Sequence, residues 1–421
     1  MESMTQTQSD FQIGASALAD RLMAGERPFV LDVRNRDEFE RWRLEGRDGP
    51  LEAVNQPYFE MFDYLEGDDV VGALATYAER HLTDRLPREG EILVVCAKGD
   101  TSDLVAQALR RLGYRAVNLA GGMVAWGNFY RFALVEQGER LTLLQGQRIA
   151  RGCLSYVAIS RGEAVVVDPG RHLRPYEEVL RERGAKLVAV IDTHAHADHI
   201  SGGPELAARL GVPYYLHPYD GIHPIDMLPA ELEYDYLREG SEIGFGESKV
   251  RVLHVPGHTL GNTALVVDDR FLLTGDTIFI DSVARPDLGG QGERWAPIHY
   301  RSLRRLAELP GETVVLPGHF SKLAEADEWG IFRRELGRLR KENEGLSKLE
   351  EGEEAYIRYL LSSLPEFPEQ YVEIKRVNGG LVRPDEEKAS ELELGKNICA
   401  LAQAYQGAEG NGNPDGGDGD E

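Results

Sequence analysis

Residues 193–199 bring together three imidazoles and a carboxylate in the pattern His194-x-His196-x-Asp198-His199. Side chains of these types are costly to bury unless a strong partner compensates them. Neutral imidazole combined with carboxylate suits zinc or iron far better than magnesium or calcium. The alternative interpretation is a polar loop whose histidines are solvated. Because residues of the same types recur downstream, we expect a metal site here.

Three further candidate ligands each follow an apolar segment that we predict to be a strand. They are His258, Asp276 and His319, and the predicted strands end at residues 255, 274 and 316. Open sheets place their functional loops at strand ends. A single Pro-Gly-His turn would mean little, since proline and glycine mark any turn. Four strand ends that carry His or Asp together indicate one metal site assembled from separate loops.

The whole set resembles the metallo-β-lactamase superfamily over about residues 141–320. The resemblance rests on the motif at 194–199, followed by His258, Asp276 and His319. Asp168 also fits the opening of that family, although an aspartate in its position is by itself typical of a turn. The resemblance implies a metallo-β-lactamase αββα sandwich.

This resemblance leaves two reactions open, and the first is oxidation of a persulfide. His194, His258 and Asp276 would bind one Fe(II) per chain and leave about three positions for the sulfur and O₂. His196 would be a fourth ligand or an orienting neighbour. The resembling enzymes use O₂ to oxidise a low-molecular-weight thiol persulfide, glutathione persulfide or similar, to sulfite.

The second reaction is thioester hydrolysis of the glyoxalase II type. It would need a second metal on Asp198, His199 and His319, with zinc in place of iron and Asp276 bridging the two ions. In the dioxygenase, the same three residues would instead tune the metal ligands through hydrogen bonds. The residue types alone do not separate the alternatives, because they suit both zinc and iron.

The segment 280–288 favours the dioxygenase. Its residues Ala284-Arg285-Pro286-Asp287 are similar to the Gly-Arg-Thr/Pro-Asp signature of persulfide dioxygenases, with Ala284 in place of the glycine. Glyoxalase II differs at this point. Arg285 and Asp287 would lie in the substrate loop, and a local salt bridge that shapes this loop is their alternative role.

Cys96 is a second candidate centre of reactivity, because it ends an apolar segment and precedes a predicted helix. Backbone N–H groups and the helix dipole stabilise a thiolate at such a position. The alternative is a buried apolar cysteine that completes a strand. Lys98, Gly99 and the hydroxyls of the intervening loop favour a reactive thiolate.

The region 11–135 resembles a single-domain rhodanese, a sulfurtransferase fold whose loop cysteine carries a persulfide. The matching segments are Leu31–Arg34, Glu38-Phe39, the loop that begins at Cys96, and Gly121–Trp126. Thr101 stands where an arginine is common and Asp100 adds negative charge, which weakens the attraction for thiosulfate. The resemblance implies that Cys96 relays sulfane sulfur from a persulfide. A catalytically silent docking module is the alternative.

The elements that must position these groups divide the chain into α/β units. Strands alternating with helices over 11–135 predict a parallel sheet covered on both faces, and we expect residues 136–150 to be a connector. The metallo-β-lactamase-fold domain is expected to span 141–407, with a helical C-terminal extension that packs on it. Residues 408–421 are acidic and rich in Gly, Asn and Asp, which predicts a disordered tail.

Cys153 and six further histidines are expected to have structural roles. Cys153 lies within a strand pattern and is expected to pack in the core. The other histidines match no ligand position of the resembling family; they are His81, His172, His217, His223, His254 and His299.

The composition of this chain of 421 residues excludes some classes of binding partner. The net charge is −24 and no basic cluster occurs, which argues against nucleic acid and against an anionic membrane surface. No apolar run approaches the roughly 18 residues of a membrane span. Three widely spaced cysteines and a start without a leader pattern predict a cytoplasmic location. A homodimer is left open.

Overall fold

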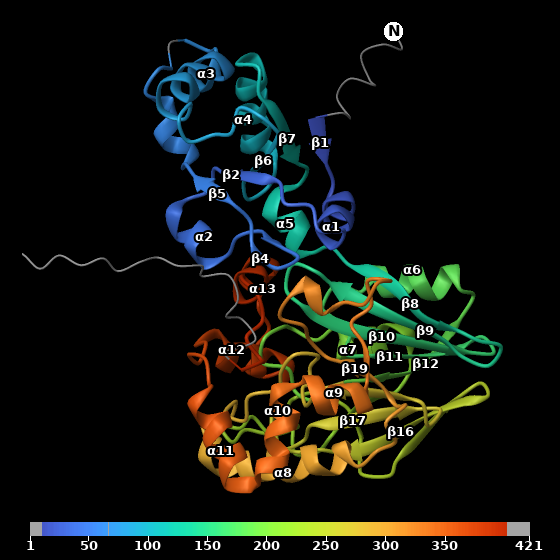
Figure 1. Ribbon diagram of the computed structural model, residues 1–421. Coiled ribbons are helices and arrows are strands. Elements are labelled where there is room, and N and C mark those ends of the chain that lie inside the picture. The colour runs from blue at the N-terminus through green and yellow to red at the C-terminus, as the bar shows by residue number, and fades with distance from the viewer. Residues whose placement is uncertain (1–10, 66, 402–421) are drawn as a thin grey trace, which may run out of the picture.

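The computed structural model describes residues 11–65 and 67–401 and arranges them as two stacked lobes (Figure 1). The upper lobe contains the N-terminal residues and one main sheet, and the lower lobe contains two larger sheets. The tail expected at 408–421 lies outside the described residues. None of the helices among the described residues is both long and apolar enough to cross a membrane.

The upper lobe is built on a five-stranded sheet, in the order β1-β7-β6-β2-β5, in which every neighbouring pair is parallel. Its strands are β1 (Gln12–Ile13), β2 (Phe29–Asp32), β5 (Ala53–Asn55), β6 (Glu91–Val95) and β7 (Arg115–Leu119). The helices are α1 (Ala15–Met23), α2 (Arg36–Arg41), α3 (Val70–His81), α4 (Asp100–Arg111) and α5 (Gly122–Gly127), and β3 (Glu45–Gly46) forms a short hairpin with β4 (Gly49–Pro50).

Helices cover both faces of this sheet. Successive residues of a strand point to opposite faces, so Val94 of β6 packs in one cluster with residues of α3 and α4. Its neighbours Leu93 and Val95 pack in the other cluster with residues of α1 and α5. The prediction of a parallel α/β domain is confirmed.

The lower lobe contains a seven-stranded sheet, β14-β13-β12-β11-β10-β9-β8, and a six-stranded sheet, β15-β16-β17-β18-β19-β20. The strands of the seven-stranded sheet are β8 (Arg131–Gln137), β9 (Thr142–Arg148), β10 (Cys153–Ser160), β11 (Glu163–Val167), β12 (Lys186–Ile191), β13 (Tyr214–Leu216) and β14 (Asp235–Tyr236). Those of the six-stranded sheet are β15 (Glu242–Phe245), β16 (Ser248–His254), β17 (Thr263–Val267), β18 (Phe271–Gly275), β19 (Val314–Pro317) and β20 (Arg334–Glu335).

The boundary between the lobes differs from the expected one. The first domain was expected to end at residue 135 and residues 136–150 to form a connector, but residues 131–137 form β8, which pairs with β9 as an antiparallel hairpin. The turn is closed by the bond from Gly138 N to Leu141 O, of 2.9 Å. The second sheet therefore begins at Arg131, because β8 supplies its outermost strand.

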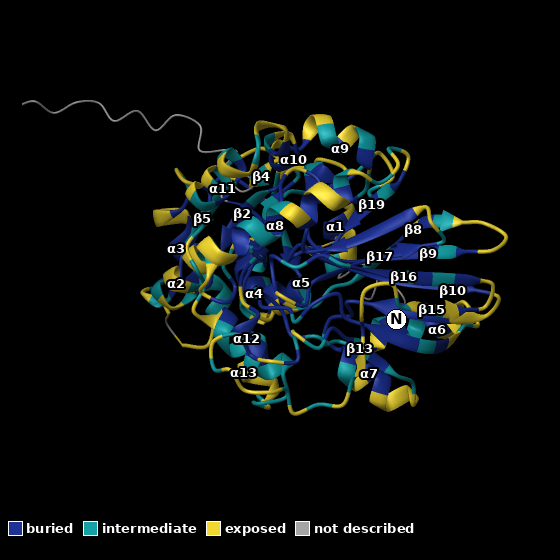
Figure 2. Ribbon diagram, turned by 90° about the horizontal axis from the view of Figure 1, so that it is seen from below, coloured by how far each residue is buried: buried dark blue, intermediate teal, exposed yellow. Residues whose placement is uncertain are grey.

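The lower lobe has four layers, with its two sheets packed face to face (Figure 2). Residues of the inner faces, such as Tyr156 and Val252, share one buried cluster. Helices α6 (Arg174–Glu182) and α7 (Gly203–Leu210) contribute to the cluster on the outer face of the seven-stranded sheet. Helix α8 (Gly292–Ala307) covers the six-stranded sheet. This αββα arrangement is the predicted one.

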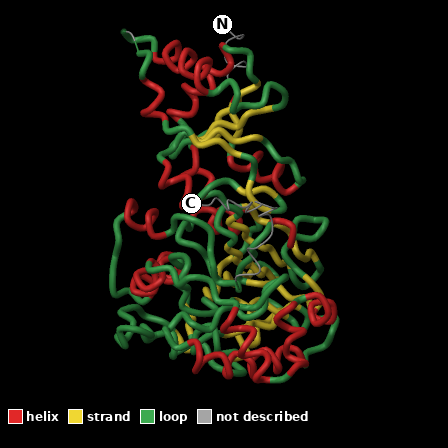
Figure 3. The backbone as a smooth tube through the Cα atoms, turned by 60° about the vertical axis from the view of Figure 1, so that its left-hand side comes forward, coloured by secondary structure: helices red, strands yellow, loops and turns green. Residues whose placement is uncertain are grey.

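The C-terminal helices extend from the six-stranded sheet back to the junction with the upper lobe in Figure 1, and Figure 3 shows the two lobes from another side. They are α9 (Leu336–Glu342), α10 (Glu344–Ser347), α11 (Glu353–Ser362), α12 (Gln370–Asn378) and α13 (Glu386–Leu392). Near the junction, Lys396 forms an ion pair with Glu45 of the upper lobe. One buried cluster also runs through both lobes, joining Leu18 and Trp126 to Phe320.

Candidate metal centre and thiol loop

The ends of four strands carry the predicted metal-binding residues. The motif loop follows β12 and precedes α7, and His258 follows β16. Asp276 directly follows β18, and His319 lies just beyond β19. These side chains are all buried, and His194, His258 and Asp276 are completely inaccessible. The fold thus brings together residues that are widely separated in the sequence.

Three buried atoms face one another without a hydrogen-bond partner among the described residues. They are Nε2 of His194, Nε2 of His258 and Oδ2 of Asp276. Asp276 Oδ2 lies 3.3 Å from His258 Nε2 and 3.9 Å from His194 Nε2. Unsatisfied buried polar atoms are costly, and a divalent cation would satisfy all three at once. The donor set therefore fits a metal ion.

The opposite ring nitrogens show which tautomer each of these histidines adopts. His258 Nδ1 lies 2.8 Å from the carbonyl oxygen of Arg285, which can only accept, so Nδ1 carries the proton. Thr193 Oγ1 donates to Asp168 Oδ2 over 2.9 Å and accepts from His194 Nδ1 over 3.0 Å. Both Nε2 atoms consequently keep a free lone pair. Burial lowers the pKa of both imidazoles, which keeps them neutral.

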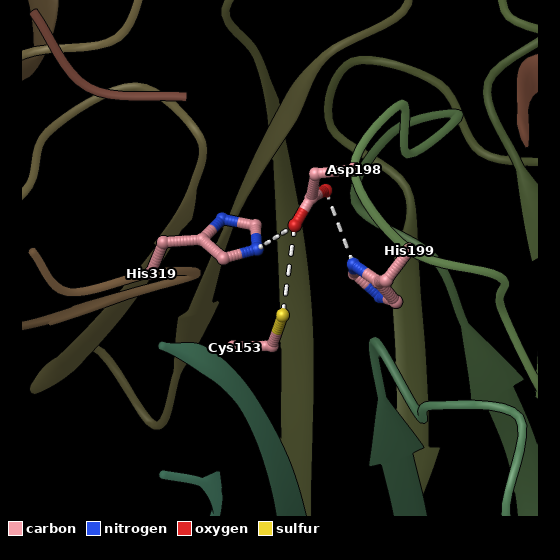
Figure 4. Close-up of side chains that lie close together, drawn as sticks. All are labelled: Cys153, Asp198, His199 and His319. Carbon is pink, nitrogen blue, oxygen red and sulfur yellow. Dashed lines mark hydrogen bonds and ion pairs between the residues drawn. The ribbon is translucent and has the colours of Figure 1, made fainter. Parts of the chain in front are cut away.

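A second group of buried residues lies beside the first, and its members bond to one another (Figure 4). His319 lies between two carboxylates, with Nδ1 2.6 Å from Asp276 Oδ1 and Nε2 2.8 Å from Asp198 Oδ2. Asp198 Oδ1 also lies 3.1 Å from His199 Nδ1. Burial opposes protonation of His319, but the two carboxylates outweigh it and raise its pKa well above the usual value. The contact of His319 Nε2 with Asp198 is close enough for an ion pair but is not a hydrogen bond, so this nitrogen stays available.

His196 and Asp168 form a further group rather than joining the first three residues. His196 Nε2 lies 3.2 Å from Asp168 Oδ1, which also accepts the backbone N–H of Thr193 over 2.7 Å. The ring of His196 is centred 4.2 Å from that of His194. Asp168 is thus more than a turn residue, because it holds the start of the motif loop. Whether His196 is a fourth ligand stays a prediction.

Arg285 and Asp287 form the local salt bridge that was the alternative role for them. The guanidinium is completely buried and binds both carboxylate oxygens, with Nε to Oδ1 at 2.7 Å and Nη2 to Oδ2 at 2.8 Å. Arg285 also donates to Pro365 O over 3.0 Å, while its own carbonyl holds His258. The loop that carries Arg285 and Asp287 therefore orients His258, a candidate metal ligand.

Sequence reasoning missed three residues around the centre. Cys153, expected to be simple core packing, points its sulfur at Asp198 Oδ2 over 3.5 Å. Cys399 lies within reach of Asp276 and His319. Lys375 of α12 donates to Ala195 O, inside the motif, over 2.9 Å. A lysine on the buried side of α12, next to Ile374, was the one signal in the sequence that could have pointed to such a role.

Cys96 lies in a loop that stabilises a thiolate. Its sulfur accepts hydrogen bonds from Gly99 N at 3.1 Å, Ser102 N at 3.4 Å and Ser102 Oγ at 3.1 Å. Burial opposes ionisation, but these bonds outweigh it and lower the pKa of Cys96. Gly99 has φ +94°, and a Cβ there would meet Gly121 N at 2.6 Å, so the loop needs glycine.

Comparison with known proteins identifies both lobes. Residues 148–319 match the metallo-beta-lactamase superfamily, and residues 15–129 match the rhodanese-like domain. An uncharacterized protein of Mycobacterium leprae is 36% identical over 193 residues, which cover 40% of this chain and 86% of that protein. The chain therefore belongs to the metallo-beta-lactamase superfamily and carries a rhodanese-like domain in front.

The relatives and solved structures with more informative names are named as different kinds of protein. A hydroxyacylglutathione hydrolase of Xanthomonas euvesicatoria is 36% identical over 165 residues, covering 39% of this chain and 59% of the enzyme. A metallo-beta-lactamase structure from Staphylococcus aureus aligns with a TM-score of 0.50 at 26% identity, covering 57% of this chain and 72% of that one. The structure of ETHE1 from Myxococcus xanthus aligns with a TM-score of 0.45 at 22% identity, covering 60% and 99%.

Proposed function

We propose that the lower lobe is an iron-dependent persulfide dioxygenase and that the upper lobe is a sulfurtransferase working with it. The observation that supports this most is the set of three unpartnered atoms on His194, His258 and Asp276. Two imidazoles and one carboxylate with open positions are typical of non-haem iron oxygenases.

The proposed reaction converts a thiol persulfide, O₂ and water into the free thiol and sulfite. The sulfane sulfur loses four electrons and O₂ gains four, so no further oxidant is needed. A bound Fe(II) would supply the redox chemistry that lets O₂ react with the sulfur. The sulfur–sulfur bond breaks when water releases the oxidised sulfur, and the thiol leaves with a proton.

The protein's own residues prepare this centre in three ways. Arg285 O and Thr193 Oγ1 hold the two imidazoles through Nδ1, so that their Nε2 atoms would be the ones to bind an ion. His319 occupies Asp276 Oδ1, which leaves Oδ2 as the oxygen for the metal. His319 also lies between Asp276 and Asp198, where it bridges the first group of buried residues to the second.

In the upper lobe, the Cys96 thiolate would attack the sulfane sulfur of a persulfide and release its thiol. The enzyme persulfide formed there then gives its outer sulfur to another acceptor, and sulfite as acceptor yields thiosulfate with the thiolate regenerated. The hydrogen bonds from Gly99 and Ser102 support this role, because they stabilise the anionic sulfur both before and after transfer.

A dinuclear zinc hydrolase of the glyoxalase II type is the second candidate. Asp198, His199, His319 and Cys153 offer ligand atoms within 4.8 Å of one another, as a second ion would require. The hydroxyacylglutathione hydrolase relative is consistent with it. Against it, the Nδ1 atoms of His199 and His319 already have carboxylate partners in Asp198 and Asp276, although His319 Nε2 makes no hydrogen bond to any described residue.

Parallel assays of both reactions on one preparation test the proposal. The full chain, purified without oxygen and loaded with iron, should consume O₂ and release sulfite when given a low-molecular-weight thiol persulfide, with glutathione persulfide as one member of the series tested. It should hydrolyse S-lactoylglutathione at only a background rate. Rapid thioester hydrolysis by the zinc-loaded chain, with no oxygen uptake by the iron-loaded chain, would overturn the dioxygenase.

A further inference from the structure

A largely apolar cavity of about 290 Å³ lies directly beside the motif loop. Ala195 and Thr259, the residues that follow His194 and His258, form part of its wall. The rest comes from within residues 219–230, 260, 291–295 and 375–381, and its larger apolar members include Ile222, Met227, Leu228, Leu260, Trp295 and Leu381. Met227 and Leu228 are 69% and 50% exposed, so apolar surface extends to the outside.

Lys375 is the one buried cation in this wall. Its side chain is 5% exposed and donates to Ala195 O over 2.9 Å, and it makes no ion pair with any described residue. Burial lowers the pKa of Lys375, and the attraction of the Asp220 carboxylate opposes this shift without cancelling it. An ammonium carries three donors, so it retains capacity for an anionic partner.

The other ionisable groups of the wall are already engaged. Asp220 Oδ2 accepts from Ala195 N at 2.8 Å and from Thr259 Oγ1 at 2.7 Å, and Oδ1 accepts from Gly261 N at 2.8 Å. His223 has Nε2 3.2 Å from Val372 O, and its Nδ1 accepts from Asp226 N at 3.0 Å. Among the described residues that line the cavity, Lys375 is thus the available charge.

We propose that this cavity binds the body of the substrate thiol, and that it selects a thiol with an apolar chain and a single anionic group, such as a carboxylate, paired with Lys375. The inference rests on the proposed function for the reacting sulfur. Glutathione fits the wall poorly, because its two carboxylates, ammonium group and amides would lose water against apolar side chains.

Binding of unreactive thiols separates this selection from catalysis. Mercaptohexanoate and mercaptohexanol share a chain and differ in the carboxylate, and glutathione is the polar comparison. Calorimetric titration of the zinc-loaded full chain should give the tightest binding for mercaptohexanoate. Fluorescence of Trp295 should change on binding, and a Trp295→Phe variant should lose that signal.

Replacement of Lys375 decides whether the ammonium recognises the anion. Lys375→Met should weaken mercaptohexanoate binding about 10- to 100-fold, the usual scale for a charged hydrogen bond, and leave mercaptohexanol binding unchanged. Lys375→Arg should keep most of the preference for the carboxylate. A purely structural role would weaken both ligands equally, and this result would overturn the proposal, as would tighter binding of glutathione than of mercaptohexanoate.

Oxygen uptake with the persulfides of mercaptohexanoate and mercaptohexanol distinguishes failure of the proposed dioxygenase from failure of the proposed binding site. If no persulfide supports oxygen uptake while Lys375→Met still abolishes the carboxylate preference, the dioxygenase fails and the binding site stands. If oxygen uptake is normal and Lys375→Met changes neither binding nor the KM for mercaptohexanoate persulfide, the binding site fails and the dioxygenase stands.

Discussion

At the scale of the residue, the hydrogen bond at Nδ1 decides which nitrogen of each imidazole is left for a metal. His194 and His258 use Nδ1 as the donor, so Nε2 keeps its lone pair towards Asp276. His319 likewise has Nδ1 on Asp276 Oδ1, and its Nε2, although 2.8 Å from Asp198 Oδ2, makes no hydrogen bond to a described residue. In all three histidines a partner at Nδ1 leaves Nε2 as the nitrogen without a hydrogen bond.

Thr193 is predicted to support metal binding without touching the ion. Thr193→Val keeps the shape but removes the acceptor for His194 Nδ1 and a donor to Asp168. Loss of such a partner typically weakens metal affinity about 10- to 100-fold. Competition with a fluorescent chelator measures this. Thr83→Val, at an exposed hydroxyl that bonds Glu79 O, is the control, and equal affinity in all three proteins would contradict the role.

Ser102 is predicted to hold the Cys96 thiolate. Ser102→Ala removes one of three hydrogen bonds to the sulfur, so the pKa of Cys96 should rise towards the ordinary value. The pH midpoint for alkylation by iodoacetamide, read at Cys96 by mass spectrometry, should move to higher pH. Thr101→Ala, in the same loop, should leave it in place. A midpoint unchanged or lowered in Ser102→Ala would contradict this account.

The residue types and spacing of the metal motif predict which strand ends meet. They do not predict the hydrogen-bond partners that decide which ring nitrogen of each histidine carries the proton. The partner of His258 is a backbone carbonyl, and no side chain marks a carbonyl acceptor. Cys153 begins a strand whose residues are all buried, so nothing distinguishes it from core packing. Contacts of this kind depend on the folded geometry.

At the scale of the element, helix α12 holds the motif loop against the sheets. Lys375 donates to Ala195 O, and Asn378 Nδ2 donates to the carbonyls of His196 and His199, both over 2.9 Å. Asn378 Oδ1 accepts from Ser201 N over 2.9 Å. Backbone groups of the loop that lack sheet partners are thereby satisfied. The C-terminal extension is part of the centre's support.

Removal of the Asn378 side chain is predicted to loosen this loop. Asn378→Ala deletes three hydrogen bonds to buried or half-buried backbone, at about 1 kcal/mol each. The free energy of unfolding in urea should fall by about 2–3 kcal/mol, and metal should dissociate faster. Gln370→Ala, at an exposed position of the same helix, should change neither. Undiminished stability of Asn378→Ala would show that α12 merely packs nearby.

Element prediction failed at β8 and β9 for a physical reason. Gln145 and Gln147 of β9 are fully buried, although their polarity suggests a surface connector. Gln145 donates to Phe332 O and Gln147 to Gly330 O, so the amides are satisfied inside the lobe. These hydrogen-bond partners lie almost two hundred residues away in the sequence and make a polar strand stable in the core. The local sequence pattern does not show them.

At the scale of the whole molecule, the two lobes meet around the thiol loop. A cavity of about 120 Å³ between them is lined by Ala97, next to Cys96, and by Arg171 and Glu393 of the lower lobe. Arg171 Nε and Glu393 Oε2 form an ion pair of 2.9 Å. The shared hydrophobic cluster holds this arrangement together. The domain order follows from the sequence, whereas the shared surface does not.

Coupling between the lobes is predicted to depend on the sulfur of Cys96. Cys96→Ser should lower thiosulfate formation from a thiol persulfide and sulfite by roughly 100-fold or more, because the nucleophile is lost. Oxygen uptake with the same persulfide should continue, since the metal centre is intact. Ion chromatography measures thiosulfate, and Thr101→Ala is the control. Unchanged thiosulfate output would make the upper lobe a silent docking module.

The identity and number of metal ions per chain test the central claim most directly. Elemental analysis of the full chain, purified without oxygen, should find one iron per chain, which Asp276→Asn loses and His199→Gln retains. Two zinc ions per chain, falling to one in His199→Gln, would contradict the mononuclear iron centre.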